Sequence, residues 1–377
     1  MNLPEDILFQ VLSRLPAKSL IRFKCVCRSW YALLEDQSFI LAHANNMINP
    51  LKRNVNAQLI LSCRDNMTNK RVISMSGDSS LDRFINQDLP PFFFNNFGQI
   101  RIVGPCYGII CLYGYPDHIA LCNPSTREFK ILPTSEIPRP NDGKVRGGDI
   151  GLGFDSKSKD YKVIQILFCI SNHRGLSYHV EIYSLGTDSW RKYAAIVPAN
   201  IMYTNTWSMI YKNETFCWWA QNGDDEVILS FHMTKEVFQE TPLPYDIEVF
   251  GGKHRTTRAI MPLNESIALI VYRVKESDKV FDIWVMNEFG LGGDHVESVW
   301  TKLSSIGPIS GVERPLGFWR DSEFILENSA RELVLYDPKT KETKNLGLYG
   351  KRDRLEVLVY YDSLVSVQKA RNTESFI

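Results

Sequence analysis

The feature that most constrains the fold is a strand–turn–strand unit that recurs along most of the chain. Each copy is an alternating apolar strand, a polar tight turn often containing Pro or Gly, and a second strand. The four clearest copies occupy residues 119–129, 180–190, 228–238 and 333–340. A looser fifth copy starts at 281–286 and has a longer, Gly-rich turn before Trp300. Repeated hairpins of this kind predict an all-β architecture built from equivalent units.

The spacing of the copies predicts which architecture this is. Large residues lie seven positions apart across the turns of three copies, at Cys122/Phe129, Tyr183/Trp190 and Phe231/Phe238. The anchor positions 122, 183, 231, 284 and 336 are 61, 48, 53 and 52 residues apart, and a period of about 50 is typical of four-stranded, kelch-type propeller blades. Residues 57–366 therefore provide about six blades. A β-sandwich with several hairpins is the alternative.

A propeller of this kind must close, because an open array would leave two unpaired sheet edges. The last apolar runs, 355–361 and 364–367, are the segments that we expect to pair with the first strand, 58–61.

The first 45 residues have a different, helical pattern. A helix follows Pro4, carries the apolar stripe Ile7, Leu8, Val11, Leu12 and Leu15, and is stopped by Pro16. Two further short helices are predicted near residues 18–25 and 28–34, with Phe39 and Ile40 in a last partial turn. The Asn-rich segment 45–50 disfavours helix and predicts the junction between the two parts.

This helical part has more large apolar side chains than so small a unit can bury by itself. Candidates for the surplus are Leu3, Pro4, Ile7, Leu15, Pro16 and Leu20. Either a partner protein covers them, as an exposed apolar patch usually indicates, or they pack against the β part of the same chain.

Composition excludes several classes of protein. With 43 basic and 43 acidic residues, the chain lacks the surplus of positive charge that a nucleic-acid binder needs. Its 44% hydrophobic content excludes disorder. The eight cysteines form no pair at zinc-ligand spacing, and their use fits a reducing compartment. Glu5 and Asp6 stand where a signal peptide carries basic residues, so we expect the cytosol or nucleus. The longest uncharged stretch, 102–116, is too short for a membrane span and is interrupted by Gly and Pro, so we expect none.

The N-terminal residues resemble an F-box over its full length. The matching segments are Leu3-Pro4-Glu5-Asp6-Ile7-Leu8, Leu12, 14–20, 22–30 and Leu33. The resemblance implies docking onto a Skp-family adaptor, which links the protein to a cullin-based ubiquitin ligase. Carried over by position, the contact residues are Leu3, Pro4, Ile7, Leu8, Leu12, Leu15, Pro16 and Leu20. Val26 and Trp30 are expected to hold the helices together.

The β part resembles the F-box-associated domain of plant proteins. The matching segments are 103–108, 123–127, 151–155, 160–163 and 181–184. Within that family the chain looks most similar to S-locus F-box proteins, through residues 282–290 and 357–366. The resulting fold prediction is α+β multidomain: an F-box at 1–45, a linker at 46–56, an all-β, kelch-like propeller of about six blades at 57–368 and a tail at 369–377.

Catalytic chemistry is not indicated. The sequence has no complete dinucleotide, phosphate-loop, zinc-protease or nucleophile-elbow motif. Asp155 and Asp160 could suggest a cation-binding loop, but aspartate is also a common turn residue because its side chain hydrogen-bonds to the nearby backbone, and this explains both. We therefore expect no catalytic, cofactor or metal site. Neighbouring residues on a strand point to opposite faces, so one of Trp218 and Trp219 is expected on the surface, as a candidate substrate-binding residue. The long polar segments 134–147, 170–178, 196–208 and 245–258 are candidates for recognition loops.

These features predict the substrate-recognition adaptor of a Skp–cullin–F-box ubiquitin ligase, acting by proximity. The S-locus resemblance implies a pollen self-incompatibility determinant that recruits a style ribonuclease taken up by pollen. Two alternatives stay open. One is an adaptor of the same type with an unrelated target, such as an immune or hormone-response regulator. The other is a propeller enzyme that has acquired an F-box.

Overall fold

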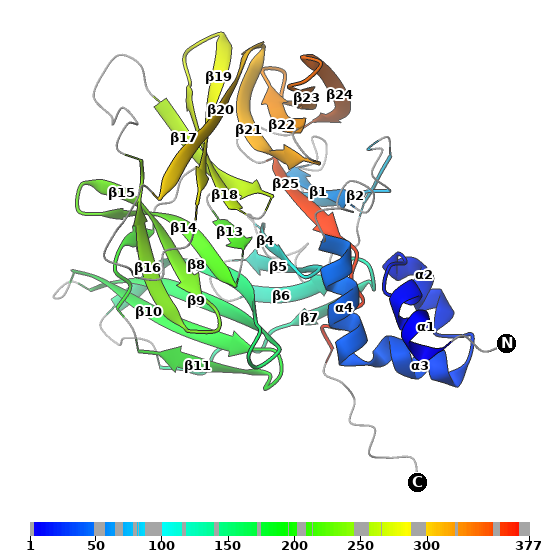
Figure 1. Cartoon of the computed structure of the whole chain (residues 1–377). Coiled ribbons are helices and arrows are strands. Elements are labelled where there is room, and N and C mark those ends of the chain that lie inside the picture. Colours follow the sequence, from blue (N-terminus) through cyan, green and yellow to red (C-terminus); the bar gives the residue numbers. More distant parts are fainter. Residues whose placement is uncertain are drawn as a thin grey trace.

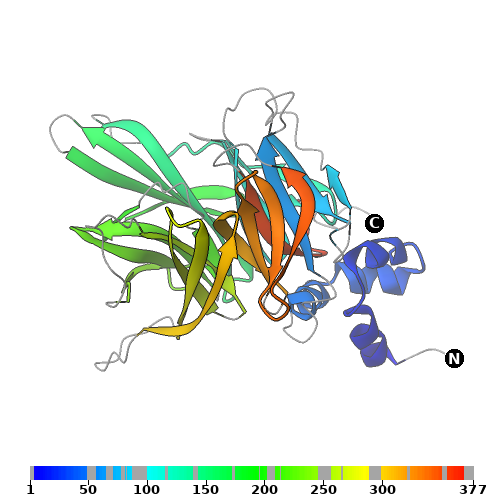
Figure 2. The ribbon, with the colours of Figure 1, turned by 90° about the horizontal axis from the view of Figure 1, so that it is seen from above.

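A helical unit at one end of a closed β-propeller makes up the architecture of the protein (Figures 1 and 2). The structure is a computed structural model. It describes residues 4–48, 57–64, 71–77, 81, 83–86, 100–114, 118–138, 143–171, 175–194, 196–201, 209–212, 214–244, 256–264, 266–287, 299–320, 323–349 and 355–368.

The helical unit has four helices: α1 (Glu5–Leu12), α2 (Ala17–Phe23), α3 (Arg28–Glu35) and α4 (Gln37–Ile48). Pro4 and Pro16 directly precede α1 and α2, where a missing N–H costs no intrahelical hydrogen bond. The three predicted helices are confirmed, with boundaries that differ by a few residues.

Helix α4 corrects the prediction of a partial turn followed by a junction at residues 45–50. Asp36 starts the helix, because its Oδ1 accepts hydrogen bonds from the backbone N–H groups of Ser38 (2.9 Å) and Phe39 (3.1 Å). The helix then continues through the Asn pair to Ile48. The Asn46 side chain donates to the carbonyl of Ser13 at 3.3 Å and to its hydroxyl at 3.0 Å. This tertiary contact outweighs the weak intrinsic preference of Asn against helix.

Twenty-five strands in the described part of the chain form six antiparallel sheets, and each sheet is one blade. Blade 1 contains β25 (Glu356–Tyr361), β1 (Ala57–Arg64), β2 (Arg71–Ser76) and β3 (Phe84–Asn86). Blade 2 contains β4 (Ile100–Cys106), β5 (Ile109–Gly114), β6 (His118–Asn123) and β7 (Glu128–Ile131). Blade 3 contains β8 (Gly143–Asp155), β9 (Asp160–Ser171), β10 (Gly175–Ser184) and β11 (Ser189–Tyr193).

The other three blades follow in chain order. Blade 4 contains β12 (Asn200–Ile201), β13 (Met209–Lys212), β14 (Thr215–Asn222), β15 (Asp225–His232) and β16 (Val237–Pro242). Blade 5 contains β17 (Thr256–Leu263), β18 (Ser266–Arg273), β19 (Asp278–Met286) and β20 (Trp300–Ser310). Blade 6 contains β21 (Val312–Trp319), β22 (Glu323–Asn328), β23 (Glu332–Asp337) and β24 (Glu342–Tyr349).

The blades close into a ring, which confirms the propeller and excludes the sandwich. The inner strands β4, β8, β13, β17, β21 and β25 contact one another in that order, and β25 contacts β4 again. The predicted pairing of the chain's first and last strands is also confirmed, with Ala57 opposite Tyr361 and Ser62 opposite Glu356. The prediction was wrong for residues 364–367, which follow β25 without forming a strand.

The seven-residue spacing of the repeat has a simple geometric cause. Cys122 lies directly opposite Phe129, Tyr183 opposite Trp190, Phe231 opposite Phe238 and Tyr336 opposite Thr343. Each turn places a left-handed residue five positions after its anchor: Arg127, Asp188, Glu236 and Lys341, with φ between 53° and 62°. The repeat in the sequence therefore records one turn geometry in four blades.

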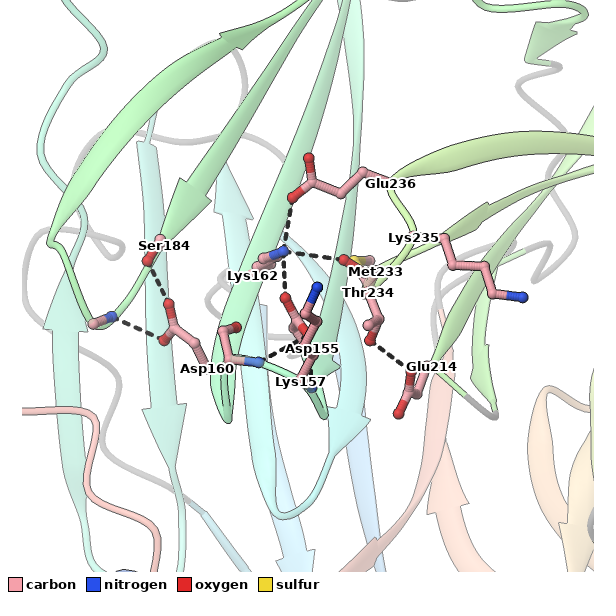
Figure 3. A network of polar contacts seen from close by, with 12 residues as sticks. Asp155, Lys157, Asp160, Lys162, Ser184, Glu214, Met233, Thr234, Lys235 and Glu236 are labelled. Atoms are coloured by element: carbon pink, nitrogen blue, oxygen red, sulfur yellow. Dashed lines mark hydrogen bonds and ion pairs between the residues drawn. The ribbon is translucent and has the colours of Figure 1, made fainter.

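A buried ionic contact joins blades 3 and 4 at the end of the propeller where these turns lie (Figure 3). The ammonium group of Lys162 on β9 is 2.6 Å from Asp155 Oδ2 and 2.7 Å from Glu236 Oε1. It also donates to the carbonyl of Met233 at 3.1 Å. One cation on blade 3 thus neutralises a carboxylate of its own blade and one on the β15–β16 turn of blade 4.

The two aspartates of this region are turn residues, as predicted. Asp155 Oδ1 accepts hydrogen bonds from the backbone N–H groups of Lys157 (2.9 Å) and Ser158 (3.2 Å). Asp160 accepts hydrogen bonds from the Ser184 hydroxyl and from the N–H of Gly186 (2.9 Å). Both carboxylates are therefore committed to turn geometry.

The charges of this contact shift its pKa values. Burial opposes ionisation of Asp155 and Glu236, but the hydrogen bonds from Lys162 outweigh it and lower the pKa of both carboxyl groups. Burial likewise opposes the charge on Lys162, and its two carboxylate partners outweigh that effect and raise its pKa.

We expect Lys162→Met to lower the free energy of unfolding by about 3 kcal/mol at neutral pH, because it removes the cation that Asp155 and Glu236 share, although Glu236 keeps its ion pair with the exposed Arg191. A carboxylate with a lowered pKa stabilises the fold above its unfolded pKa of about 4, and this contribution disappears as the pH falls through the folded pKa. The lysine contribution is complete below about pH 10 and is lost as the pH rises through its raised pKa.

The difference between wild type and variant should therefore be constant from about pH 5 to pH 9 and shrink below about pH 4. Urea unfolding followed by tryptophan fluorescence at several pH values measures it, with the exposed Lys339→Met as the control. An equal loss at pH 3 and pH 7 would contradict the prediction.

Candidate docking surface and its joint to the propeller

The helical unit has a small core of its own, completed by one residue from the far end of the chain. Its buried side chains are Leu12, Ala17, Leu20, Leu34 and Phe39, together with Leu364 from the segment after β25. Phe9 packs edge-on against Phe39, with ring centroids 5.2 Å apart. The core therefore unites helices α1 to α4 with the C-terminal segment.

Two of the predicted partner contacts belong to this core rather than to the surface. Leu12 and Leu20 are 2% and 0% exposed, so they support the helices from within and present no surface to a partner. Leu8 and Leu15 are half-buried against the same core. Pro4 and Pro16 are exposed, as is Ile7, at 45%. Leu3 lies outside the described residues.

The apolar stripe of α1 thus divides between two faces. Ile7 and Val11, one turn apart, are 45% and 50% exposed, whereas Leu8 and Leu12 point toward the core. Sequence reasoning treated these positions as one stripe because they adjoin on the helix. The i, i+4 relation of Ile7 and Val11 was the available signal for a second face.

Two further exposed apolar residues were not predicted. Val26, expected to hold the helices together, is 59% exposed, because it lies in the turn between α2 and α3. Tyr31 on α3 is 53% exposed. Trp30 does pack as predicted, edge-on to Phe23 at 5.5 Å. We define the head surface as the exposed apolar residues of the helical unit: Pro4, Ile7, Val11, Pro16, Val26 and Tyr31.

Another part of the helical unit packs against the propeller. Of the candidates for surplus apolar surface, Leu15 and Leu20 pack in the helical core, and Pro4, Ile7 and Pro16 are exposed. Helix α4 contacts β25, and Ile40 and Leu41 pack against the large core of blades 2 to 4. The Nε2 atom of the buried His43 lies 2.9 Å from the carbonyl oxygen of Leu15, which ties α4 to the turn before α2. Burial lowers the pKa of His43.

The segment Asp362–Gln368 forms the joint between the helical unit and the propeller. Leu364 enters the helical core, while Val365 and Val367 belong to the core of blades 2 to 4. The side-chain amide of Asn123, the last residue of β6, donates to the carbonyls of Ser363 (3.0 Å) and Val365 (2.7 Å). The backbone of this segment is therefore held by blade 2.

Buried hydroxyl and carboxylate groups complete the joint. Ser125 donates to Asp362 Oδ1 at 2.9 Å, and its hydroxyl lies 2.7 Å from that of Tyr360. Gln58 on β1 donates to the same Asp362 oxygen at 3.1 Å. At Gly108, φ is +80° and a Cβ atom would lie 2.1 Å from the Ser363 Cβ. Only glycine fits there, because it has no Cβ atom and adopts a positive φ without strain. The turn between β4 and β5 can therefore approach the joint closely.

The paired tryptophans do not form a surface site. Trp218 is 0% and Trp219 4% exposed, so the expectation that one of them faces solvent is wrong. Trp218 packs among Phe216 and Phe238 of blade 4, whereas Trp219 belongs to the core shared with blade 5. The alternation rule does place them on opposite faces, but neighbouring blades cover both faces of a propeller sheet.

Within the described residues, no group of three or more His, Cys, Asp or Glu side chains is arranged to hold a metal ion.

Burial raises the pKa of the Cys122 thiol to about 12 and also raises the pKa of the Cys111 and Cys217 thiols. The exposed Cys27 has a lowered pKa, because the Ser29 hydroxyl and the first N–H groups of α3 stabilise its thiolate. In the part of the chain that the structure describes, no helix is long and apolar enough to cross a membrane.

Comparison with known proteins agrees with this two-part organisation. Residues 1–41 match the F-box domain, and residues 65–367 match the F-box associated beta propeller domain. The first match covers most of the helical head, and the second covers most of the propeller. The chain therefore belongs to the family of plant-type F-box proteins that carry an F-box associated β-propeller domain.

The similarity to relatives and to a solved structure extends over most of the chain. An F-box/kelch-repeat protein of Arabidopsis thaliana is 28% identical, with 89% of this chain and 88% of the relative covered. The F-box protein CPR1 of the same plant is 26% identical, with 92% and 84% covered. The crystal structure of TolB from Acinetobacter baumannii is similar with a TM-score of 0.46 and 12% identity, with 86% of this chain and 72% of TolB covered.

We expect Leu364→Ala to loosen the helical unit and to leave the propeller closed, because β25 ends before this residue. Removing a buried leucine side chain costs about 2–5 kcal/mol, and here the cavity would open in the helical core. Hydrogen–deuterium exchange should show faster exchange in α1, α2 and α4 and unchanged protection in β1 and β25.

The matched control is Ser366→Ala, in the same segment but exposed. Unchanged protection of the helices in the Leu364 variant would contradict the role given to this residue.

Proposed function

We propose that the chain is the substrate-recognition adaptor of a Skp–cullin–F-box ubiquitin ligase. In this role the head surface binds a Skp-family adaptor, which connects the protein to the cullin scaffold. The propeller holds a protein target near the ubiquitin-loaded enzyme. Such an adaptor accelerates transfer by raising the local concentration of the target and needs no catalytic side chain of its own. We place this activity in the cytosol or nucleus.

The observation that carries the proposal is the exposed apolar head surface on an otherwise well-packed unit. Six apolar residues of one small helical unit stay exposed although its core is complete. Exposed apolar side chains gathered on a small unit favour a protein interface, because burying them on a partner releases ordered water. Of the residues that the F-box resemblance pointed to, Pro4, Ile7 and Pro16 can contact a partner directly. Leu8 and Leu15 can do so in part.

A second feature supports the adaptor role. The head packs against the propeller through α4 and through the joint at Asp362–Gln368, and the contacts on both sides of that joint are buried. Ligase adaptors depend on holding the target at a defined distance from the transfer site, and a packed joint serves that purpose better than a flexible linker.

The target would bind at the end of the propeller opposite the head. Strands of a blade alternate in direction, so one end of blade 3 contains Gly143 of β8, Ser171 of β9 and Gly175 of β10. These strand ends lie away from the joint at Asp362–Gln368, which follows the opposite end of β25. The strand ends that flank the four predicted recognition segments belong to this far end. Loops at one end of a rigid scaffold commonly carry recognition.

A style ribonuclease is the target that we propose from the S-locus resemblance of residues 282–290 and 357–366. The role is testable in the plant. Co-purification from pollen with the proteasome blocked should enrich style ribonucleases, and expression should be concentrated in pollen. Strong leaf expression together with unrelated captured proteins would contradict this target and favour an adaptor of the same type acting elsewhere.

The head is tested directly by Ile7→Asp combined with Val11→Asp. Both side chains are about half exposed, so the variant should fold, yet each carboxylate would lie where the partner needs an apolar contact. We expect the Kd for a purified Skp-family adaptor to rise by at least about 100-fold, as is typical when interface anchors are lost. Isothermal titration calorimetry measures the change.

The matched control is Ile196→Asp, because Ile196 is 89% exposed and lies on the propeller. Undiminished binding by the double variant would refute the proposed docking surface.

A further inference from the structure

The helical unit separates its charges in a way that the apolar head surface does not explain. Between Ile7 and Leu34 the sequence has five basic residues and no acidic one, although the whole chain has equal numbers of both. The five are Arg14, Lys18, Arg22, Lys24 and Arg28. The basic residues of this unit are thus separated along the sequence from its acidic residues, which are Glu5, Asp6, Glu35 and Asp36.

Only one of these five residues has an ionic partner within the described part of the chain. Lys24 binds Glu35 at 2.5 Å, between the turn after α2 and the end of α3. Arg14, Lys18, Arg22 and Arg28 are exposed and form no salt bridge with any described residue. Their charges are therefore available to a partner.

Two of the free charges lie on α2, and a third lies in the turn before it. Lys18 and Arg22 are one helical turn apart on α2, whereas Arg14 precedes Pro16 and lies outside the helix. Like charges at this spacing repel each other and weaken a helix by a few tenths of a kcal/mol. Helix α2 has no acidic residue in its first turn to compensate for this repulsion. An arrangement that costs stability in the free chain suggests a use in a complex.

The position of these three charges indicates which partner they meet. Pro16, part of the head surface, lies between Arg14 and Lys18 in the sequence, and all three are exposed. Pro16 also precedes α2 directly, so basic residues flank this member of the apolar surface on both sides in the sequence. Any protein that covers Pro16 must bring its own edge close to these charges.

We propose that Arg14, Lys18 and Arg22 form a basic edge of the docking surface and bind an acidic edge of the Skp-family adaptor. This inference rests on the proposed function and adds an electrostatic component to it. Charges at the rim of an apolar interface mainly speed association and orient the partners, whereas the buried apolar contacts determine how slowly the complex dissociates.

The test is the association rate of a purified Skp-family adaptor with the full-length chain at about 50 mM and about 300 mM NaCl. For the wild type we expect faster association at low salt. In the variant Arg14→Glu, Lys18→Glu, Arg22→Glu we expect the rate at low salt to fall about tenfold, with a weaker salt dependence and a nearly unchanged dissociation rate. A variant with Arg14→Lys, Lys18→Arg and Arg22→Lys should retain the wild-type rate.

The control has the same change in net charge on the propeller: Lys275→Glu, Lys339→Glu, Lys341→Glu, all at exposed positions. Wild-type association by the head variant, faster association, or an equal loss in the control would each overturn the basic edge while leaving the proposed function intact. Failure of the wild-type chain to bind the adaptor at any salt concentration would overturn the proposed function and this inference with it.

Discussion

The pairing of β25 with β1 is the contact on which the rest of this structure depends. Those strands are separated by nearly the whole chain, so their hydrogen bonds close the ring of blades and remove its two open edges. The backbone that leaves β25 then carries Leu364 into the helical core and Val365 and Val367 into the propeller core. One stretch of chain therefore closes the propeller and holds the head.

This arrangement explains why the helical unit can keep an apolar surface exposed. Its own core is small, but Leu364 completes it, and α4 adds contacts with the propeller through Ile40 and Leu41. The unit does not need the head surface for its stability, so these side chains can remain available to a partner. The exposed basic residues on α2, Lys18 and Arg22, have the same property, because they form no ion pair with any residue that the structure describes.

The repeat was the part of the fold most accessible to sequence reasoning. Each hairpin needs the same left-handed residue at the end of its turn, and this local constraint leaves a visible period in the sequence. Closure was predictable for a similar reason, since a propeller with unpaired edges would aggregate. Helix α4 was missed because its Asn residues disfavour helix locally, and tertiary contacts such as those of Asn46 with Ser13 and of His43 with Leu15 compensate for them. The tryptophan pair was misjudged because alternation along a strand does not reveal that both faces of a blade are covered.

By itself, the sequence determined the two-part organisation, the number of blades and the F-box character of the head, because these follow from local periodicity and from contiguous motifs. Which apolar residues of the head are exposed was decided only by the tertiary structure. Leu12 and Ile7 have similar side chains and lie on the same short helix, yet one is buried and the other is half exposed. The difference is one of position: Leu12 belongs to a core built from all four helices and from Leu364, more than 300 residues away in the chain, and Ile7 lies outside that core.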